Sequence, residues 1–174
     1  TILGGEFEAG LRSLYQRLAT GTPNSGAQCE PVISLTKQRF RVPERAGLPP
    51  LSAYAYVETA DGIHHVAGHT EATRGCKHRC RHCPVVPVYD GRFYVVPRDI
   101  VMEDVRRQVA AGARHITFCD PDFFNGIGHA IHLVQAFHAE FPTVSFDATI
   151  KIEHLLKHRV HLATLRATGC LFVT

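Results

Sequence analysis

Three cysteines are crowded into eight residues of this 174-residue chain. Cys76, Cys80 and Cys83 have the spacing C-x3-C-x2-C and stand among several Arg and Lys residues. Thiolates this close on one loop can converge on a single metal centre. A cubane [4Fe–4S] cluster has one iron more than three thiolates can cover, and that iron is open to a substrate or cofactor. The neighbouring cations would offset the negative charge of the cluster, so the sequence favours an iron–sulfur site.

Two other interpretations of this loop stay open. A zinc-binding module would use the three thiolates with His78 or His82 as fourth ligand, and its basic residues would bind nucleic acid. Zinc sites usually combine a C-x2-C pair with a second pair, which this chain lacks. An electron-transfer iron–sulfur protein is disfavoured because three ligands leave one iron uncovered. The isolated cysteines are expected to be small buried hydrophobic residues rather than ligands: Cys29, Cys119 and Cys170.

Composition limits the class of protein. The 19 Lys and Arg against 16 Asp and Glu give a net charge of +3, too mild for binding driven by nucleic-acid phosphates. A hydrophobic content of 45% excludes wholesale disorder. No apolar run approaches the roughly 18 residues of a membrane helix, and no secretory leader opens the sequence. We therefore expect a soluble, cytoplasmic protein that binds neither membrane nor nucleic acid.

Helix and strand patterns alternate after the cysteines. Amphipathic helical patterns are expected over residues 97–111, 127–141 and 155–165, and strands over 63–70, 116–119, 144–151 and 170–173. Strands separated by helices of this length require crossovers and a parallel sheet. The fold class predicted is therefore α/β, with four parallel strands and three helices.

The third of these strands carries polar residues at alternate positions: Ser145, Asp147, Thr149 and Lys151. A doubly wound sheet would be apolar on both faces because helices cover both. One polar face predicts instead a partial barrel, with helices outside and an active site on the inner face. An edge strand with a solvated face is the alternative. The apolar residues between the polar ones are expected to pack on helices: Val144, Phe146 and Ile150.

The first sixty residues have a different pattern. A helical pattern covers residues 7–18, a loop rich in Gly, Pro, Ser and Asn follows, and residues 32–35 suit a short strand. Residues 37–50 resemble a linker, since they are basic and contain Pro49 and Pro50. A hairpin is expected over residues 54–70, with its turn at Asp61 and Gly62.

We predict two parts in the chain. Residues 1–60 are an N-terminal helix and linker, the tail of an upstream domain, and residues 61–174 form the N-terminal half of a barrel core. The sequence begins without Met and ends on an apolar run, Leu171 to Val173. We therefore interpret it as a piece of a longer protein, and we expect the last strand to have an unpaired edge.

The cysteine spacing after a first strand, leading into repeating βα units, resembles the radical S-adenosylmethionine (SAM) superfamily. The resemblance covers residues 63–174, roughly half of the family's core. It implies a partial (β/α) barrel of radical SAM type, truncated after the fourth strand. It also implies an enzyme whose [4Fe–4S] cluster binds SAM at its open iron and cleaves it reductively to a 5′-deoxyadenosyl radical. The substrate is unknown, the implied electron donor is a protein such as flavodoxin or ferredoxin, and a piece this short is expected to be inactive.

The resemblance assigns roles only to positions that match. The cluster ligands would be Cys76, Cys80 and Cys83. His82 takes the position before the third cysteine, where the family commonly has an aromatic residue near the adenine. Asp120 and Asp122 follow the second strand, where the family binds the SAM amino group, although either acid could instead cap the next helix. Thr149 and Lys151, at the end of the third strand, would face the SAM ribose or carboxylate. No residue is assigned to catalysis.

Near the N-terminus, residues 5–8 read Gly-Glu-Phe-Glu before the first helix. This resembles the G-E-x-E junction that leaves the cobalamin-type domain of some radical SAM proteins. The resemblance implies a cobalamin cofactor in the full-length protein only, since no cobalamin ligand stands in these residues. An ordinary N-terminal helix and linker is the alternative.

Overall fold

The computed structural model describes residues 3–21 and 33–174, which belong to two compact units. Thr1–Arg39 and Gly75–Arg92 form the first, here called the cysteine unit. Phe40–Arg74 and Phe93–Thr174 form the second, the half-barrel unit. The predicted division into residues 1–60 and 61–174 stays a prediction. Within the described ranges, no helix is both long and apolar enough to cross a membrane.

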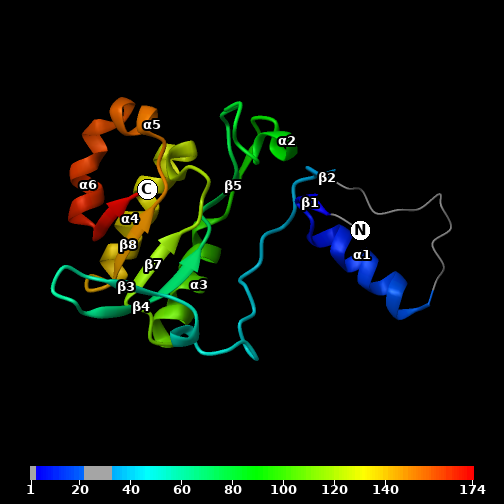
Figure 1. The fold of residues 1–174 in the computed structure, drawn as a ribbon, viewed down its shortest axis with the longest axis horizontal. Helices are drawn as coiled ribbons and strands as arrows, with labels where there is room; N and C mark the ends of the chain where they lie inside the picture. Colours follow the sequence, from blue (N-terminus) through cyan, green and yellow to red (C-terminus); the bar gives the residue numbers. More distant parts are fainter. Residues whose placement is uncertain (1–2, 22–32) are drawn as a thin grey trace. The chain divides into compact units, whose positions relative to one another are not determined.

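The half-barrel unit is built on a curved five-stranded sheet (Figure 1). Its strands, in spatial order, are β3 (Tyr56–Glu58), β4 (His64–Thr70), β7 (His115–Phe118), β8 (Ser145–Ala148) and β9 (Cys170–Val173). β3 and β4 pair antiparallel as the predicted hairpin, and the other neighbours pair parallel. The four predicted parallel strands are confirmed, with β9 at the edge of the sheet.

Helices connect the parallel strands. They are α3 (Arg98–Ala110), α4 (Ile127–Glu140), α5 (Ile152–Lys157) and α6 (Leu162–Ala167), with 3-10 turns η1 (Leu51–Ala53), η2 (Phe123–Gly126) and η3 (Arg159–His161). The first two predicted helices are confirmed. The single helix predicted over residues 155–165 is wrong, because η3 separates α5 from α6. The apolar stripe is interrupted there, since His158 and Arg159 stand where the helical period needs apolar residues.

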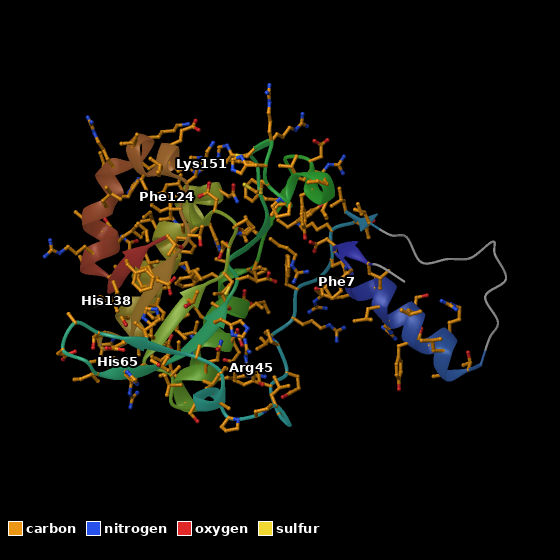
Figure 2. All side chains as sticks on the ribbon, viewed as in Figure 1. Phe7, Arg45, His65, Phe124, His138 and Lys151 are labelled. Carbon is orange, nitrogen blue, oxygen red and sulfur yellow. The ribbon has the colours of Figure 1, made fainter. Side chains whose placement is uncertain are left out.

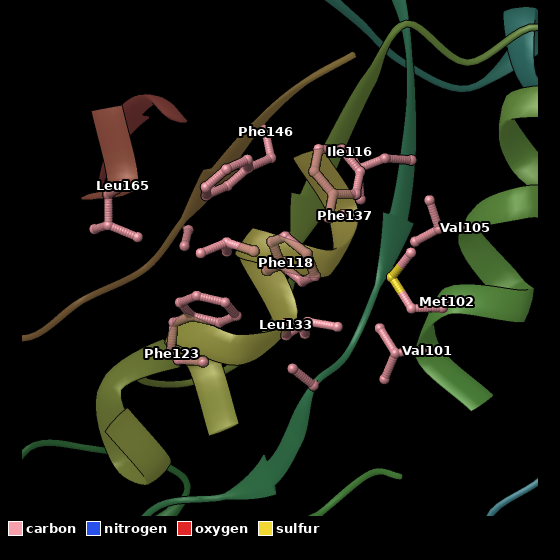
Figure 3. Packing of buried hydrophobic residues seen from close by; sticks show 14 of the residues in the cluster. Val101, Met102, Val105, Ile116, Phe118, Phe123, Leu133, Phe137, Phe146 and Leu165 are labelled. Atoms are coloured by element: carbon pink, nitrogen blue, oxygen red, sulfur yellow. The ribbon is translucent and has the colours of Figure 1, made fainter. Parts of the chain in front are cut away.

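One face of the sheet is apolar and packs on the helices (Figure 3). Ile116, Phe118 and Phe146 are at most 1% exposed. The Phe146 ring lies edge-on to Phe118 and to Phe137 of α4, with centroids 5.5 and 5.7 Å apart. Val144 and Ile150 belong to the same core, as predicted from the alternation. The opposite face carries the polar residues of the strands and is called the polar face below.

The linker is held to the half-barrel by a buried polar network. Arg45 is labelled in Figure 2. Its Nε and Nη2 each donate to a different oxygen of Asp104, at 2.9 Å. Asp104 is 1% exposed and also accepts from Gln108 Nε2 at 3.0 Å. The Gln108 amide, in turn, bonds the backbone N–H and C=O of His69, both at 2.9 Å. Arg45 is therefore fixed to the half-barrel although the residues around it form no helix or strand.

The cysteine unit contains little regular structure. β1 (Gly4–Gly5) pairs parallel with β2 (Ile33–Ser34), and the helices are α1 (Glu8–Ala19) and α2 (Val86–Tyr89). The predicted N-terminal helix and short strand are confirmed, apart from Val32, which lies outside the described residues. β5 (Thr73–Gly75) and β6 (Phe93–Val95) form a two-stranded sheet at the start and end of the segment Gly75–Arg92.

Candidate functional site

Cys76, Cys80 and Cys83 lie on one loop of the cysteine unit, directly after β5. Cys76 is buried, and the other two are half-buried. Two turns curve the loop, since the Cys83 N–H donates to the Cys80 carbonyl at 3.2 Å and the Val86 N–H to the Cys83 carbonyl at 3.3 Å. None of the cysteines in the described part of the chain forms a disulfide. The loop thus offers three thiols on a short curved backbone.

The donor set of this loop fits an iron–sulfur cluster. The loop offers three thiols, from Cys76, Cys80 and Cys83, within eight consecutive residues. A single tetrahedral zinc, with Zn–S bonds of about 2.3 Å, would draw thiolates to roughly 3.8 Å. A cubane cluster binds each thiolate to a different iron and so needs a wider spacing. Ligation itself stays a prediction.

Gly75 fixes how the loop begins. Its φ of +81° is a conformation that favours glycine. A Cβ at this position would lie 2.6 Å from the Arg92 carbonyl oxygen and 2.6 Å from the Tyr89 ring. The absence of a side chain therefore lets the start of the loop approach the end of α2.

The loop segment also contacts the N-terminal Gly-Glu-Phe-Glu motif. Glu6 is fully buried, and the Tyr89 hydroxyl donates to its Oε1 at 3.3 Å. The Glu6 N–H donates to the Ser34 carbonyl at 2.7 Å, and the Gln38 side chain donates to the Glu6 carbonyl. Sequence patterns gave no sign of the contact between Glu6 and Tyr89, which lie far apart in the chain.

Charged residues surround the cysteines. Arg79 pairs with Asp90, with 3.1 Å between Nε and Oδ1, and both side chains are about 70% exposed. Lys77 and Arg81 are exposed as well. His82 is exposed in the turn before Cys83. Its predicted contact with the SAM adenine stays a prediction.

In the half-barrel unit, the remaining predicted SAM residues gather at one edge of the sheet. Asp120 and Asp122 follow β7, and Thr149 and Lys151 follow β8. β7 and β8 are parallel neighbours, so both segments leave the same edge of the sheet. A hydrogen bond from the Phe123 N–H to the Thr149 carbonyl, at 2.8 Å, joins the two segments. This edge is where parallel α/β sheets usually bind ligands.

Asp120 anchors the turn between β4 and β5. It is 2% exposed, and its Oδ2 accepts from the Ala72 N–H at 3.0 Å. Its Oδ1 accepts from the N–H and the hydroxyl of Thr73. Burial raises the pKa of Asp120 to about 6, although these hydrogen bonds oppose the shift. The carboxylate therefore holds the backbone three residues before Cys76, and its predicted contact with SAM stays a prediction.

Asp122 caps η2, as the alternative interpretation expected for one of the two acids. Its Oδ1 accepts from the Phe124 N–H at 3.1 Å. Its Oδ2 lies 2.7 Å from Nδ1 of His154, and both side chains are at most 3% exposed. The pairing with His154 was not predicted, because nothing in the helix pattern after β8 distinguishes this histidine.

Thr149 and Lys151 mark the end of β8 and the start of α5. The Thr149 hydroxyl lies 3.0 Å from the Thr174 hydroxyl, at the ends of neighbouring strands. Lys151, labelled in Figure 2, is the N-terminal residue flanking α5. Its Nζ pairs with Glu153 at 2.7 Å. Their predicted contacts with the SAM ribose or carboxylate stay predictions.

The isolated cysteines differ in their surroundings. Cys119 was expected to be buried and is exposed, because it follows β7 on the side of the polar residues. Cys170 is half-buried, and burial raises the pKa of its thiol to about 11, so it remains protonated near neutral pH. Cys29 lies outside the described residues.

Comparison with known proteins places this fold. No family model and no curated protein matches the sequence. The structure is similar to that of the radical S-adenosylmethionine methyltransferase TsrM from Kitasatospora setae with tryptophan substrate and a SAM analog bound, with a TM-score of 0.68 and 20% identity. A second TsrM structure, with cobalamin and a [4Fe–4S] cluster bound, gives a TM-score of 0.67 and 19% identity. Each match covers 98% of this chain and 36% of the other, so the chain spans about a third of that enzyme's length. The chain therefore has a radical SAM-like fold, with its α/β sheet forming a partial barrel.

Proposed function

We propose that this chain is the first half of the core of a radical SAM enzyme, with Cys76, Cys80 and Cys83 holding a [4Fe–4S] cluster. The observation that supports this most is the three-cysteine loop, which along the chain follows β4, the first parallel strand of the half-barrel, and precedes α3. The structural neighbours have this fold and bind a SAM analog and a [4Fe–4S] cluster. At their level of identity the similarity supports the fold, and the cysteines supply the argument for the cofactor.

The chain's own residues would bind and orient the cofactors. The three thiolates would cover three irons and leave the fourth for the amino and carboxylate groups of SAM. When bound, the cluster would supply the electron that cleaves SAM to a 5′-deoxyadenosyl radical. Gly75 would fix the start of the ligand loop, and Asp120 would hold the preceding turn through Ala72 and Thr73.

For SAM itself we propose the residues expected from the sequence. His82 would contact the adenine from its exposed position before the third ligand. Asp120 and Asp122 would lie at the amino group, and Thr149 and Lys151 at the ribose or carboxylate. The hydrogen bond that joins the segments after β7 and β8 supports a shared site for these last four residues.

The wider context is also a proposal. The Gly-Glu-Phe-Glu motif suggests the subgroup with an upstream cobalamin-type domain, and cobalamin would bind in the full-length protein only. The electron donor would be a protein such as flavodoxin or ferredoxin, and the enzyme would act in the cytoplasm. The chain alone would bind cofactors without completing the reaction.

Anaerobic reconstitution with iron and sulfide tests the cluster. We expect a brown protein with about four irons per chain, whose spectrum changes when SAM is added. Replacing any one of Cys76, Cys80 or Cys83 by Ala should abolish stable cluster formation. The matched controls Cys119→Ala and Cys29→Ala should keep the full iron content. One tightly bound zinc and no iron would contradict the proposal and support the zinc-binding nucleic-acid module instead.

A further inference from the structure

The polar face of the half-barrel sheet carries a buried network that the cofactor residues do not include. It joins β7 to β8 through side chains whose backbones are register partners: His115 with Ser145, and Thr117 with Asp147. His115 is fully buried, and Asp147 is 6% exposed. Burying several polar side chains together lowers the stability of the fold unless each of them is hydrogen-bonded.

The histidine is fully satisfied within this network. His115 Nδ1 lies 2.8 Å from the Ser145 hydroxyl, and Nε2 lies 2.8 Å from Asp147 Oδ1. The neutral tautomer with its proton on Nε2 fits both contacts, since it donates to the carboxylate and accepts from the serine. In this tautomer the ring brings no positive charge to Asp147.

Asp147, by contrast, is satisfied at one oxygen only. Its Oδ1 accepts from His115 Nε2 and from the Thr117 hydroxyl, the latter at 2.6 Å. Its Oδ2 makes no hydrogen bond to any side chain or backbone group that the structure describes, and it is not among the fully buried polar atoms. The network therefore orients the carboxylate and leaves one of its oxygens available to a ligand.

An aromatic ring adjoins the Asp147 side chain. Phe172 of β9 is the register partner of Asp147, and its ring stacks on that of His115 with centroids 6.1 Å apart. Phe172 is 44% exposed, although it is large and apolar. An aromatic ring beside a carboxylate offers apolar contact to the carbon atoms of a ligand whose charged group reaches the carboxylate.

We propose that Asp147 is a substrate-binding residue that accepts a hydrogen bond from an organic ammonium group, with Phe172 contacting the apolar part of the same molecule. The proposal rests on the proposed function, because it makes the polar face of the half-barrel the substrate side of that enzyme. A charge-assisted hydrogen bond is about twice as strong as a neutral one, so an ammonium is the donor that best satisfies this carboxylate.

An NMR titration of the full chain, without cluster or SAM, tests this binding directly. The probe is 2-phenylethylamine at pH 7, which is an ammonium attached to an aromatic ring. Two matched probes separate the contributions: its N,N,N-trimethyl derivative keeps the charge without an N–H, and 3-phenylpropionate reverses the charge. We expect 2-phenylethylamine to bind at least about tenfold more tightly than either, with shifts at the amides of Thr117, Asp147 and Phe172.

Two variants assign the binding to these residues. Asp147→Asn keeps the oxygen that His115 and Thr117 contact and replaces Oδ2 by an NH2 group, so affinity should fall by about tenfold or more. Phe172→Leu, at an exposed position, should weaken binding severalfold, and Asp61→Asn in the hairpin turn should not change it. If Asp147→Asn unfolds the chain, the trimethyl probe and Phe172→Leu still decide the question.

Three outcomes would overturn the proposal: no binding of 2-phenylethylamine, equal binding by Asp147→Asn, or equal affinity for the trimethyl probe. Failure here is distinguishable from failure of the proposed function, because the titration needs neither iron nor SAM. A chain that assembles its cluster and ignores the ammonium probe would keep the proposed function and lose this inference.

Discussion

The cysteine loop and the polar face of the half-barrel bring their polar or metal-binding side chains together in opposite ways. In the loop, all three thiols lie within eight consecutive residues, 76–83. On the polar face, His115 and Asp147 are 32 residues apart and meet only because β7 and β8 are neighbours in register. A site of the first kind is visible as a motif, whereas a site of the second kind exists only after strand pairing.

The two regions also depend on different contacts. The loop depends on the close backbone approach at Gly75 and on one part-buried hydrogen bond between Tyr89 and Glu6. The half-barrel contains several buried polar groups that satisfy one another, such as Arg45 with Asp104. Substitutions should therefore impair metal binding in the cysteine unit and folding in the half-barrel unit.

The largest effect on folding is expected from Asp104→Ala. It leaves the half-buried Arg45 guanidinium and the buried Gln108 amide without their acceptor, and a buried polar group left unsatisfied typically costs about 1–3 kcal/mol. Chemical denaturation followed by circular dichroism measures the loss. Asp99→Ala, in the exposed first turn of the same helix, is the control and should change little. A loss below about 1 kcal/mol would show that the network adds no stability beyond packing.

The raised pKa of Asp120 predicts that the stability of the chain depends on pH. Its pKa is about 6 in the folded chain, above the usual 3.8, so the folded state binds more protons between these values. The free energy of unfolding should therefore fall as pH rises from about 4 to 6 and then level off, with a total contribution of about 3 kcal/mol. Asp120→Asn removes this titration. Subtracting its pH profile from that of the wild type should isolate the fall, and a flat difference would contradict the assignment.

Gly75→Ala should impair cluster binding by the cysteine loop without changing a residue of the polar face. The left-handed backbone costs a residue with a Cβ about 1–2 kcal/mol, and this Cβ also meets the Arg92 carbonyl and the Tyr89 ring. We expect the reconstituted chain to lose most of its iron although all three cysteines remain. Gly62→Ala has a similar φ of +77° with no atom within 4 Å, and it should retain the iron. Equal iron contents in both variants would show that Gly75 does not position the ligands.

The smallest effect on stability is expected at the edge strand. β9 has one free edge among the described strands, and Leu171 on it is 49% exposed. Leu171→Lys should reduce self-association while the free energy of unfolding changes by about 0.5 kcal/mol or less. Leu156→Lys, on the exposed face of α5, is the control. Analytical ultracentrifugation measures the self-association of each variant. Equal association of both variants would exclude pairing through β9.

Much of the fold followed from periodicity. The strands β7, β8 and β9 and the helices α3 and α4 lie where the apolar patterns predicted them. The break between α5 and α6 was missed, although His158 and Arg159 interrupt the apolar pattern there. The exposure of Cys119 was missed although residues 115–119 alternate as strictly as residues 144–151.

The sequence by itself determined the chemistry of the cysteine loop and the α/β alternation, because both are expressed over short stretches of chain. Only the tertiary structure decided what Asp120, Asp122 and Asp147 do. Asp120 holds the backbone of residues 72–73, Asp122 meets His154, and Asp147 keeps one oxygen available beside Phe172. The physical reason is that a carboxylate takes its role from the donors around it, and the donors to Asp120 and Asp147 lie between 30 and 48 residues away along the chain.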